Sequence, residues 1–249
     1  MTYKVRKVRG KNEYKVFDSE TGVIHSTYNN LDKAKEQLDS LKNPIEGGKL
    51  PVSDIQGLLK QSYSHSIPTD YKDYIVDKEL SGKRVQVYKK LNSPQAVVVH
   101  RGTKGIHDIG NDIKYLLNYD ISNTKRAKYS QDIQTKAEQK YGAENVSTLG
   151  HSIGSKLASL VGSKSKEIIN INKAVSPADA FTKVKPNEYN IRSSKDIVSM
   201  LLPVSNNALT IQSPYFSNVL QEHKTDVLDR LDPNLLIGKG VKVFYIKGR

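Results

Sequence analysis

The sequence predicts an α/β fold with a mostly parallel sheet, preceded by a small N-terminal module of β-strands and one helix. From residue 51 to residue 249, strand-like runs alternate with helix-like runs, as in a parallel sheet covered on both faces. One strand-like run, residues 145–149, leads through a tight turn with two glycines into an apolar helical run. Residues 44–50 begin with a Pro- and Gly-containing run typical of a linker. We therefore expect a module at residues 1–43 and an α/β domain at residues 51–249.

The N-terminal module contains three short runs with strand-like composition. These runs are residues 3–8, 14–17 and 23–26. Gly10 marks a turn between the first two runs, and Gly22 closes a second turn before the third. Residues 31–41 place Leu31, Ala34 and Leu38 at helical spacing. We expect a small sheet of two or three strands and one helix.

The larger part of the chain contains the alternating elements of the α/β domain. Helices are expected at about residues 52–63, 108–119, 126–141 and 155–162. Strands are expected at about residues 84–89, 95–100, 145–149, 168–175, 189–192 and 241–246.

Composition limits the class of protein. The 249 residues suffice for one sizeable domain plus a small module. The mean hydropathy of −0.57 and the lack of a long apolar run predict a soluble chain without a membrane span. No apolar segment follows the basic N-terminus, so we expect no secretion signal and an intracellular or virion-associated location. The absence of cysteine excludes disulfides, a thiol nucleophile and Cys-based metal sites.

The net charge of +13 favours anionic partners such as nucleic acid, an acidic lipid surface or an acidic protein. The lysines are spread along the chain, however, so a solvated lysine-rich surface is an alternative explanation. No Arg-rich arm, zinc finger or aromatic RNA-binding motif supports sequence-specific nucleic-acid binding.

The turn after residues 145–149 has the sequence Gly150-His-Ser-Ile-Gly154. A strand, Gly-x-Ser-x-Gly and a helix together are the context of a nucleophile elbow, in which the glycines permit a tight turn and close packing. Ser152 is therefore a candidate nucleophile, and the backbone N–H of Ile153 a candidate oxyanion donor. The alternative is that Ser152 only caps the following helix.

Four segments, in chain order, carry a resemblance to a known family. They are the strand 97–103 ending in Arg-Gly-Thr, the acidic residues Asp108 and Asp112, the elbow 150–154, and residues 194–198 followed by Leu202-Pro203. With these segments the chain from about Pro51 onward resembles the class 3 lipases, a family of α/β-hydrolases. The resemblance implies an α/β-hydrolase fold without a cofactor.

The resemblance also implies the roles of individual residues. Asp196 is then the acid and His223, the only histidine downstream, is the base, in the Ser-Asp-His order of α/β-hydrolases. Thr103 is implied as a second oxyanion donor beside Ile153. Asp179 remains a rival acid, Asp196 an alternative helix cap, His223 an alternative surface histidine, and Arg-Gly-Thr an alternative strand-end turn.

Several features accompany this assignment. Ser155 stands where the family usually has a second glycine. His151 is expected to pack under the turn rather than act as the base. The remaining histidines have no metal-ligand spacing, so no metal site is expected. The apolar stretch 201–220 is expected to line an acyl pocket, form a lid or extend the core.

The N-terminal module is similar to short modules in proteins of large eukaryotic DNA viruses and virophages, which is a hint about source and not about chemistry. Because a linker-like break separates the module from all candidate catalytic residues, we expect it to serve attachment, to virion proteins or to an anionic membrane surface. The prediction for the whole chain is a serine ester hydrolase acting on lipid or another acyl ester through an acyl-enzyme. The alternatives are an inactive hydrolase scaffold with a structural role in a virion, and a basic module that binds nucleic acid or anionic membrane.

Overall fold

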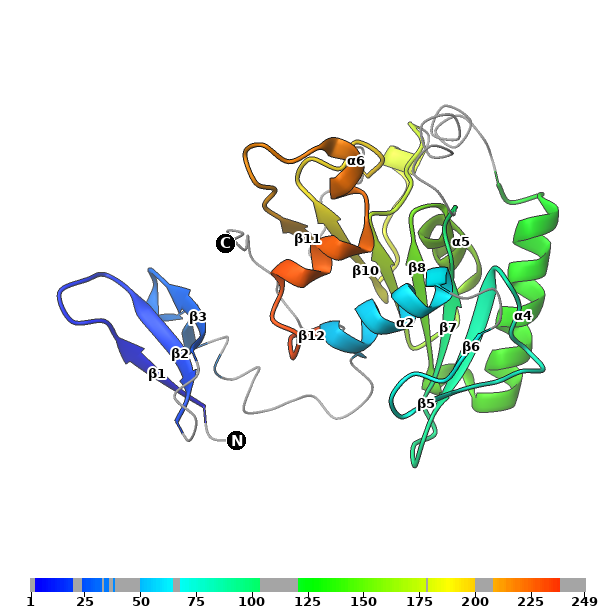
Figure 1. The fold of residues 1–249 in the computed structure, drawn as a ribbon, viewed down its shortest axis with the longest axis horizontal. Coiled ribbons are helices and arrows are strands. Elements are labelled where there is room, and N and C mark those ends of the chain that lie inside the picture. Colours follow the sequence, from blue (N-terminus) through cyan, green and yellow to red (C-terminus); the bar gives the residue numbers. More distant parts are fainter. Residues whose placement is uncertain are drawn as a thin grey trace. The chain divides into compact units, whose positions relative to one another are not determined.

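The structure is a computed structural model, shown in Figure 1. It describes residues 3–19, 24–32, 34–35, 38, 50–64, 68–103, 121–177, 179–199 and 208–237. The chain divides into two compact units, Met1–Gly47 and Gly48–Arg249.

The first unit is built on a three-stranded antiparallel sheet in the order β1-β2-β3. The strands are β1 (Tyr3–Lys7), β2 (Tyr14–Asp18) and β3 (Ile24–Tyr28). Gly10 has a φ of 75° in the turn between β1 and β2, a conformation that glycine adopts without strain. The expected strands are thus confirmed. Of the expected helix, residues 31, 32, 34, 35 and 38 are helical, and the other positions lie outside the described residues.

The second unit is built on a seven-stranded sheet in the order β11-β10-β9-β8-β7-β6-β5 (Figure 1). The strands are β5 (Tyr74–Val76), β6 (Val85–Lys90), β7 (Ala96–His100), β8 (Val146–His151), β9 (Glu167–Ile171), β10 (Glu188–Ser193) and β11 (Ala208–Ile211). The strands from β7 to β11 are parallel, while β5 and β6 are antiparallel additions at one edge. The predicted α/β class with a mostly parallel sheet is confirmed.

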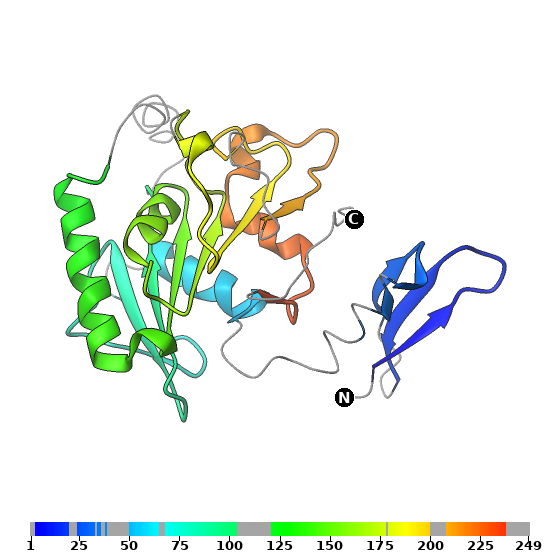
Figure 2. The same ribbon diagram turned by 180° about the vertical axis from the view of Figure 1, so that it is seen from behind.

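Helices cover both faces of this sheet, as the two opposite views in Figures 1 and 2 show. The helices are α2 (Val52–Ser64), α4 (Lys125–Tyr141), α5 (Ile153–Val161) and the short α6 (Val219–Glu222). Alternate side chains of β7 pack on opposite faces of the sheet. Val97 and Val99 pack in one apolar cluster with residues of α2, while Val98 packs in another with Ile133 of α4. All five residues of β7 are buried, as expected for a strand in the middle of a parallel sheet.

Several short elements complete the second unit. A two-stranded antiparallel sheet joins β4 (Leu50–Pro51) to β12 (Leu236–Ile237). The remaining elements are the 3-10 helices η1 (Ala143–Asn145), η2 (Asp179–Phe181) and η3 (Thr225–Arg230). Helix η3 packs near α2 on the same face of the sheet, because Val227 and Leu228 belong to the apolar cluster that contains Leu58.

The sequence-based elements agree with the structure at the centre of the sheet and less well elsewhere. The expected strands that became β6, β7, β8 and β10 are confirmed to within one or two residues. Strand β9 ends at Ile171 rather than at residue 175, and β5, β11, β4 and β12 were not expected. The expected helix 108–119 and strand 241–246 lie outside the described residues.

Candidate active site

The turn from β8 into α5 holds Ser152 in an unusual backbone conformation. Its φ of 58° and ψ of −127° lie in a region that non-glycine residues rarely occupy, at a typical cost of about 1–3 kcal/mol. Ser152 occupies the N-cap position of α5, but its side chain makes no capping hydrogen bond. The alternative role as a simple helix cap is therefore wrong, and the hydroxyl is free to bond elsewhere.

The glycines on either side of Ser152 sit where a side chain has no room. A Cβ on Gly154 would lie 2.0 Å from the carbonyl oxygen of His100. A Cβ on Gly150 would lie 2.5 Å from the Cα of Ser155. Ser155 is itself accommodated because its buried hydroxyl donates to the carbonyl oxygen of Ile171 at 3.2 Å. These close approaches let α5 start directly against the end of β7.

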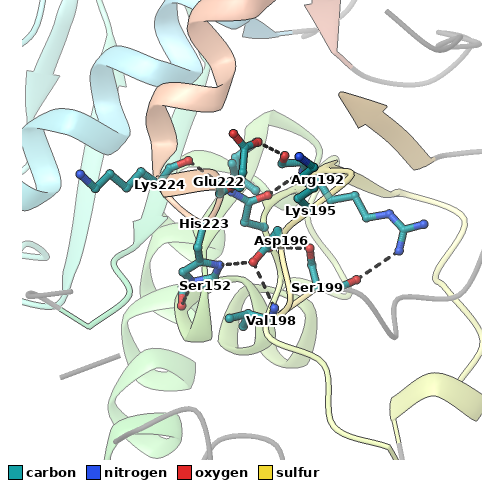
Figure 3. Close-up of polar contacts among 12 residues, drawn as sticks. Ser152, Arg192, Lys195, Asp196, Val198, Ser199, Glu222, His223 and Lys224 are labelled. Atoms are coloured by element: carbon teal, nitrogen blue, oxygen red, sulfur yellow. Dashed lines mark hydrogen bonds and ion pairs between the residues drawn. The ribbon is translucent and has the colours of Figure 1, made fainter. Parts of the chain in front are cut away.

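Ser152, His223 and Asp196 form a hydrogen-bonded chain (Figure 3). The Nε2 atom of His223 lies 2.8 Å from Oγ of Ser152, and its Nδ1 atom lies 2.8 Å from Oδ1 of Asp196. Because an ionised carboxylate only accepts, Nδ1 carries the hydrogen and Nε2 accepts from the serine. All three side chains are buried. The structure thus brings together the three residues that the resemblance implied, separated by 27 and 71 positions in the sequence.

Asp196 lies in the turn after β10, where its carboxylate is held by its own segment. Oδ1 accepts the backbone N–H of Val198 at 3.1 Å, and Oδ2 accepts the hydroxyl of Ser199. The carboxylate therefore stabilises the turn and contacts His223 at the same time. The rival Asp179 instead pairs with Lys156 at 2.7 Å and accepts the backbone N–H of Ser176 at 2.8 Å. Among the described contacts, Asp179 does not reach the histidine.

The backbone that directly follows β7 also passes close to Ser152. A Cβ on Gly102 would lie 3.0 Å from Cβ of Ser152, so the backbone before Thr103 runs along the serine. The backbone N–H of Ile153 is at the first position of α5 and therefore has no acceptor within the helix. Thr103 is half-buried. Asp108 and Asp112 lie outside the described residues.

A buried polar cluster supports the segment that carries His223. Glu222 makes two hydrogen bonds with Arg230, at 2.7 and 2.8 Å, and accepts the hydroxyls of Ser193 and Ser213. Burial tends to raise the pKa of Glu222, but the hydrogen bonds from Arg230 and from three serines, Ser217 included, outweigh it and lower the pKa to about 2. Sequence reasoning missed this cluster, because its members come from four separate segments.

The apolar stretch 201–220 divides into different parts. Residues 201–207 lie outside the described residues, while 208–211 form β11, whose Leu209 and Ile211 are core residues. Tyr215 and Phe216 follow in the connection to α6 and are 86% and 93% exposed. Their rings contact each other edge to face, with centroids 4.9 Å apart. The expectation of more core is thus confirmed for β11 and wrong for the two aromatic residues.

The described part of the chain shows no group of three side chains suited to hold a metal ion. Within the same residues, no helix combines the length and apolar character that crossing a membrane requires. His100 is buried at the end of β7, where it bonds to Gln134 at 3.3 Å, and burial lowers its pKa to about 4.

The fold and the elbow together define the class of protein. A mostly parallel sheet, with β8 leading through a strained serine into α5 and an acid and a histidine following in that order, is the α/β-hydrolase fold.

Comparison with known proteins adds a likeness to lipases at low similarity. The sequence matches no protein-family model and no curated protein. The Lip2 lipase from Yarrowia lipolytica is 14% identical, with 61% of this chain and 74% of that chain covered and a TM-score of 0.41. A triacylglycerol lipase from Penicillium expansum is 18% identical, with 66% and 79% covered and a TM-score of 0.44. At these TM-scores the chemistry of this chain has to be inferred from its own residues.

Proposed function

We propose that this protein is a serine hydrolase of carboxylic esters, of the class 3 lipase type, that acts through an acyl-enzyme. The observation that supports this most directly is the chain of 2.8 Å contacts from Asp196 through His223 to Ser152. A serine hydroxyl is a weak nucleophile until a base takes its proton, and His223 is placed to do so. The strained elbow presents that hydroxyl at the end of the sheet.

The reaction follows from these positions. Oγ of Ser152 forms a bond to the ester carbonyl carbon while its proton passes to Nε2 of His223. Collapse of the tetrahedral intermediate breaks the bond to the alcohol, which leaves with that proton. A water molecule then attacks the acyl-enzyme, with His223 again as base, and the acid and free Ser152 are released. Asp196 keeps the proton on Nδ1 and stabilises the imidazolium that forms in each step.

The negative oxygen of the intermediate requires hydrogen-bond donors. We assign the backbone N–H of Ile153 as one donor and Thr103, through its backbone and hydroxyl, as the other. The place of Ile153 at the first position of α5, where its N–H has no acceptor within the helix, and the close approach of Gly102 to Ser152 support this assignment. Each such donor is typically worth about a hundredfold to a thousandfold in rate.

A lipid ester is the substrate that the surface near this edge of the sheet favours. Tyr215 and Phe216 follow β11, and Phe181, which is 91% exposed, ends the short helix η2 after β9. Because the carboxyl ends of parallel strands share one edge, the connections that carry these aromatic residues start from the edge that carries Ser152 and Asp196. Exposed aromatic rings suit a lipid surface, where their apolar bodies are removed from water.

The test is covalent labelling of the intact protein with a fluorophosphonate, followed by hydrolysis of a soluble short-chain ester. We expect the protein to label at Ser152, and Ser152→Ala to lose labelling and more than about a thousandfold in kcat while keeping its fold. Ser64→Ala, at the exposed end of α2, is the matched control and should behave as the unsubstituted protein. Labelling of Ser152→Ala at the original rate, or no labelling of the unsubstituted protein, would contradict the proposal.

A further inference from the structure

A second chain of hydrogen bonds runs behind Ser152. The backbone N–H of Gly102 donates to the hydroxyl of Tyr63 at 2.8 Å, and that hydroxyl lies 2.7 Å from Nδ1 of His151. The Nε2 atom of His151 lies 2.7 Å from the backbone carbonyl oxygen of His223. The chain therefore links the end of β7, the helix α2, the elbow and the segment that carries the base.

The direction of each hydrogen bond is determined by its ends. The N–H of Gly102 can only donate, so the hydroxyl of Tyr63 uses its own hydrogen toward His151. The carbonyl oxygen of His223 can only accept, so Nε2 of His151 carries the hydrogen and Nδ1 accepts. Burial, with a smaller effect of His223, lowers the pKa of His151 to about 3, and burial raises the pKa of Tyr63. Both groups therefore stay neutral near pH 7 and keep this arrangement.

The segment around His223 is held at three successive carbonyl groups. His151 binds the carbonyl of His223, while the side-chain amide of Asn172 donates to the carbonyls of Glu222 and Lys224 at 2.9 and 3.2 Å. The rings of His151 and His223 also pack together, with centroids 5.3 Å apart. His151 is the last residue of β8, and Asn172 directly follows the adjacent parallel strand β9. The backbone of the base is thus attached to the same strand ends that position Ser152.

We propose that Tyr63 and His151 are positioning residues, which hold the backbone at Gly102 and the base His223 at a set separation on either side of Ser152. This inference rests on the proposed ester hydrolysis. Neither residue is assigned a contact with substrate. Their effect is to keep the general base and the strand end before Thr103 in place before the reaction begins, where a shift of about 1 Å typically costs about a hundredfold in rate.

Substitution of Tyr63 separates this role from packing. Tyr63→Phe keeps the ring but leaves the N–H of Gly102 without its acceptor and Nδ1 of His151 without its donor. We expect kcat on a soluble ester to fall about 10- to 100-fold, with KM changed by less than about twofold. Tyr141→Phe is the matched control, because it also removes a hydroxyl that bonds to a buried group, Asp77, at 2.7 Å, but Tyr141 lies just before the start of β8, whereas Ser152 follows its end. It should lower stability and leave kcat unchanged.

Two substitutions of His151 test the two ends of the chain separately. In His151→Gln the amide nitrogen occupies the place of Nε2 and can still donate to the carbonyl of His223. In His151→Asn the amide oxygen occupies the place of Nδ1 and can still accept from Tyr63. We expect His151→Gln to retain about tenfold more kcat than His151→Asn, because only the former keeps the base segment attached.

The experiment uses the full chain, with competent sites counted by complete fluorophosphonate titration and kcat expressed per labelled site. If Tyr63→Phe gives the original kcat per labelled site, or if the Gln and Asn variants of His151 are equally impaired, the positioning role is wrong. If Tyr63→Phe does not fold, the contrast between the two His151 variants decides the matter. Failure of the unsubstituted protein to label at all would instead overturn the proposed hydrolase activity.

Discussion

Three residues in or near the candidate site have a backbone conformation or a burial that is unfavourable by itself. Ser152 is strained, Glu222 is a buried carboxylate, and His151 is a buried histidine that stays neutral. Burial would be unfavourable for Glu222 and His151 in isolation, and both have hydrogen-bond partners in the structure. Glu222 has the most partners of the three, since Arg230 and two serine hydroxyls surround its oxygens. Its ionised form is therefore strongly favoured in the folded state.

The acid stability of the protein should depend on Glu222. Its pKa of about 2 when folded lies below the ordinary value of 4.5, so its stabilising effect is complete above pH 4.5 and is lost as the pH falls toward 2. We expect Glu222→Gln to lower the free energy of unfolding by about 2 kcal/mol at pH 7, and this difference to shrink below pH 4.5. Urea unfolding of both proteins between pH 7 and pH 3 measures it.

The control for this measurement is Glu79→Gln, since the side chain of Glu79 is 84% exposed in its pair with Lys140. That substitution should change the free energy of unfolding little at any pH. A difference between the unsubstituted protein and Glu222→Gln that stays constant, or grows, as the pH falls would show that ionised Glu222 is not the stabilising species.

The connection between β11 and α6 carries two strongly exposed aromatic side chains, Tyr215 and Phe216. Lys195 donates to the backbone carbonyl oxygens of Pro214 and Tyr215 and lies over the ring of Tyr215, at 5.7 Å from its centroid. The segment is thus held by a cation while it presents two exposed aromatic rings. An ordered apolar tip beside a proposed ester-hydrolysing site fits contact with a lipid surface that also attracts positive charge.

Removal of this tip should separate two kinds of substrate. We expect the double variant Tyr215→Ser, Phe216→Ser to hydrolyse a soluble ester within about twofold of the original rate. On a lipid ester in anionic vesicles we expect about a tenfold loss, which corresponds to about 1.4 kcal/mol of lost apolar burial. Steady-state rates on both substrates provide the measurement.

Leu91→Ser is the matched control, because Leu91 is 50% exposed in the turn between β6 and β7, at the opposite edge of the sheet. It should leave both rates unchanged. Equal losses of the double variant on soluble and vesicle substrates would argue against a lipid-facing tip and for a general role in folding or catalysis.

The two units of the chain differ in net charge and in the candidate site residues that they contain. Every residue proposed for the site lies in the second unit, Gly48–Arg249. Residues 1–47 contain 9 of the 39 basic and 7 of the 26 acidic side chains, so the second unit carries 11 of the 13 net positive charges. The attraction to anionic surfaces that the composition predicts is therefore mainly a property of the proposed hydrolase unit. Attachment through the first unit remains a prediction, and charge alone does not account for it.

The first unit should be dispensable for catalysis. We expect a fragment of residues 48–249 to fold and to hydrolyse a soluble ester with a kcat/KM within about twofold of the full chain. We expect its binding to anionic vesicles to weaken with added salt much as that of the full chain does, since exposed charges are screened over about 10 Å at ~0.1 M salt. Circular dichroism, ester kinetics and vesicle sedimentation test these expectations.

A fragment of residues 52–249 is the informative comparison, because it lacks the strand β4 that pairs with β12 and buries Leu50. It should be less stable than the fragment that starts at residue 48. An insoluble or inactive fragment 48–249 would show instead that the first unit is needed for the hydrolase fold.

The sequence by itself determined the features that depend on neighbouring residues. The apolar runs around β7 and β8 specify buried strands, and Gly-x-Ser-x-Gly between a strand and a helix specifies the elbow, because strand periodicity and glycine geometry act over a few positions. Chain order, with the family resemblance, was enough to nominate Asp196 and His223. The sequence did not predict the short strands β5 and β11, because three or four residues show little periodicity. These strands are held by pairing with another strand of the sheet.

Only the tertiary structure shows which carboxylate contacts His223 and which residues surround the candidate site. In the sequence, Asp179 and Asp196 are both acidic residues that follow a predicted strand. In the structure, Asp179 forms an ion pair with Lys156, whereas Asp196 is hydrogen-bonded to His223. Tyr63 gave no signal beyond its place at the end of a helix, yet it meets His151 across 88 positions. Such contacts depend on how the layers pack, and side-chain hydrogen bonds between distant segments leave no local pattern in the chain.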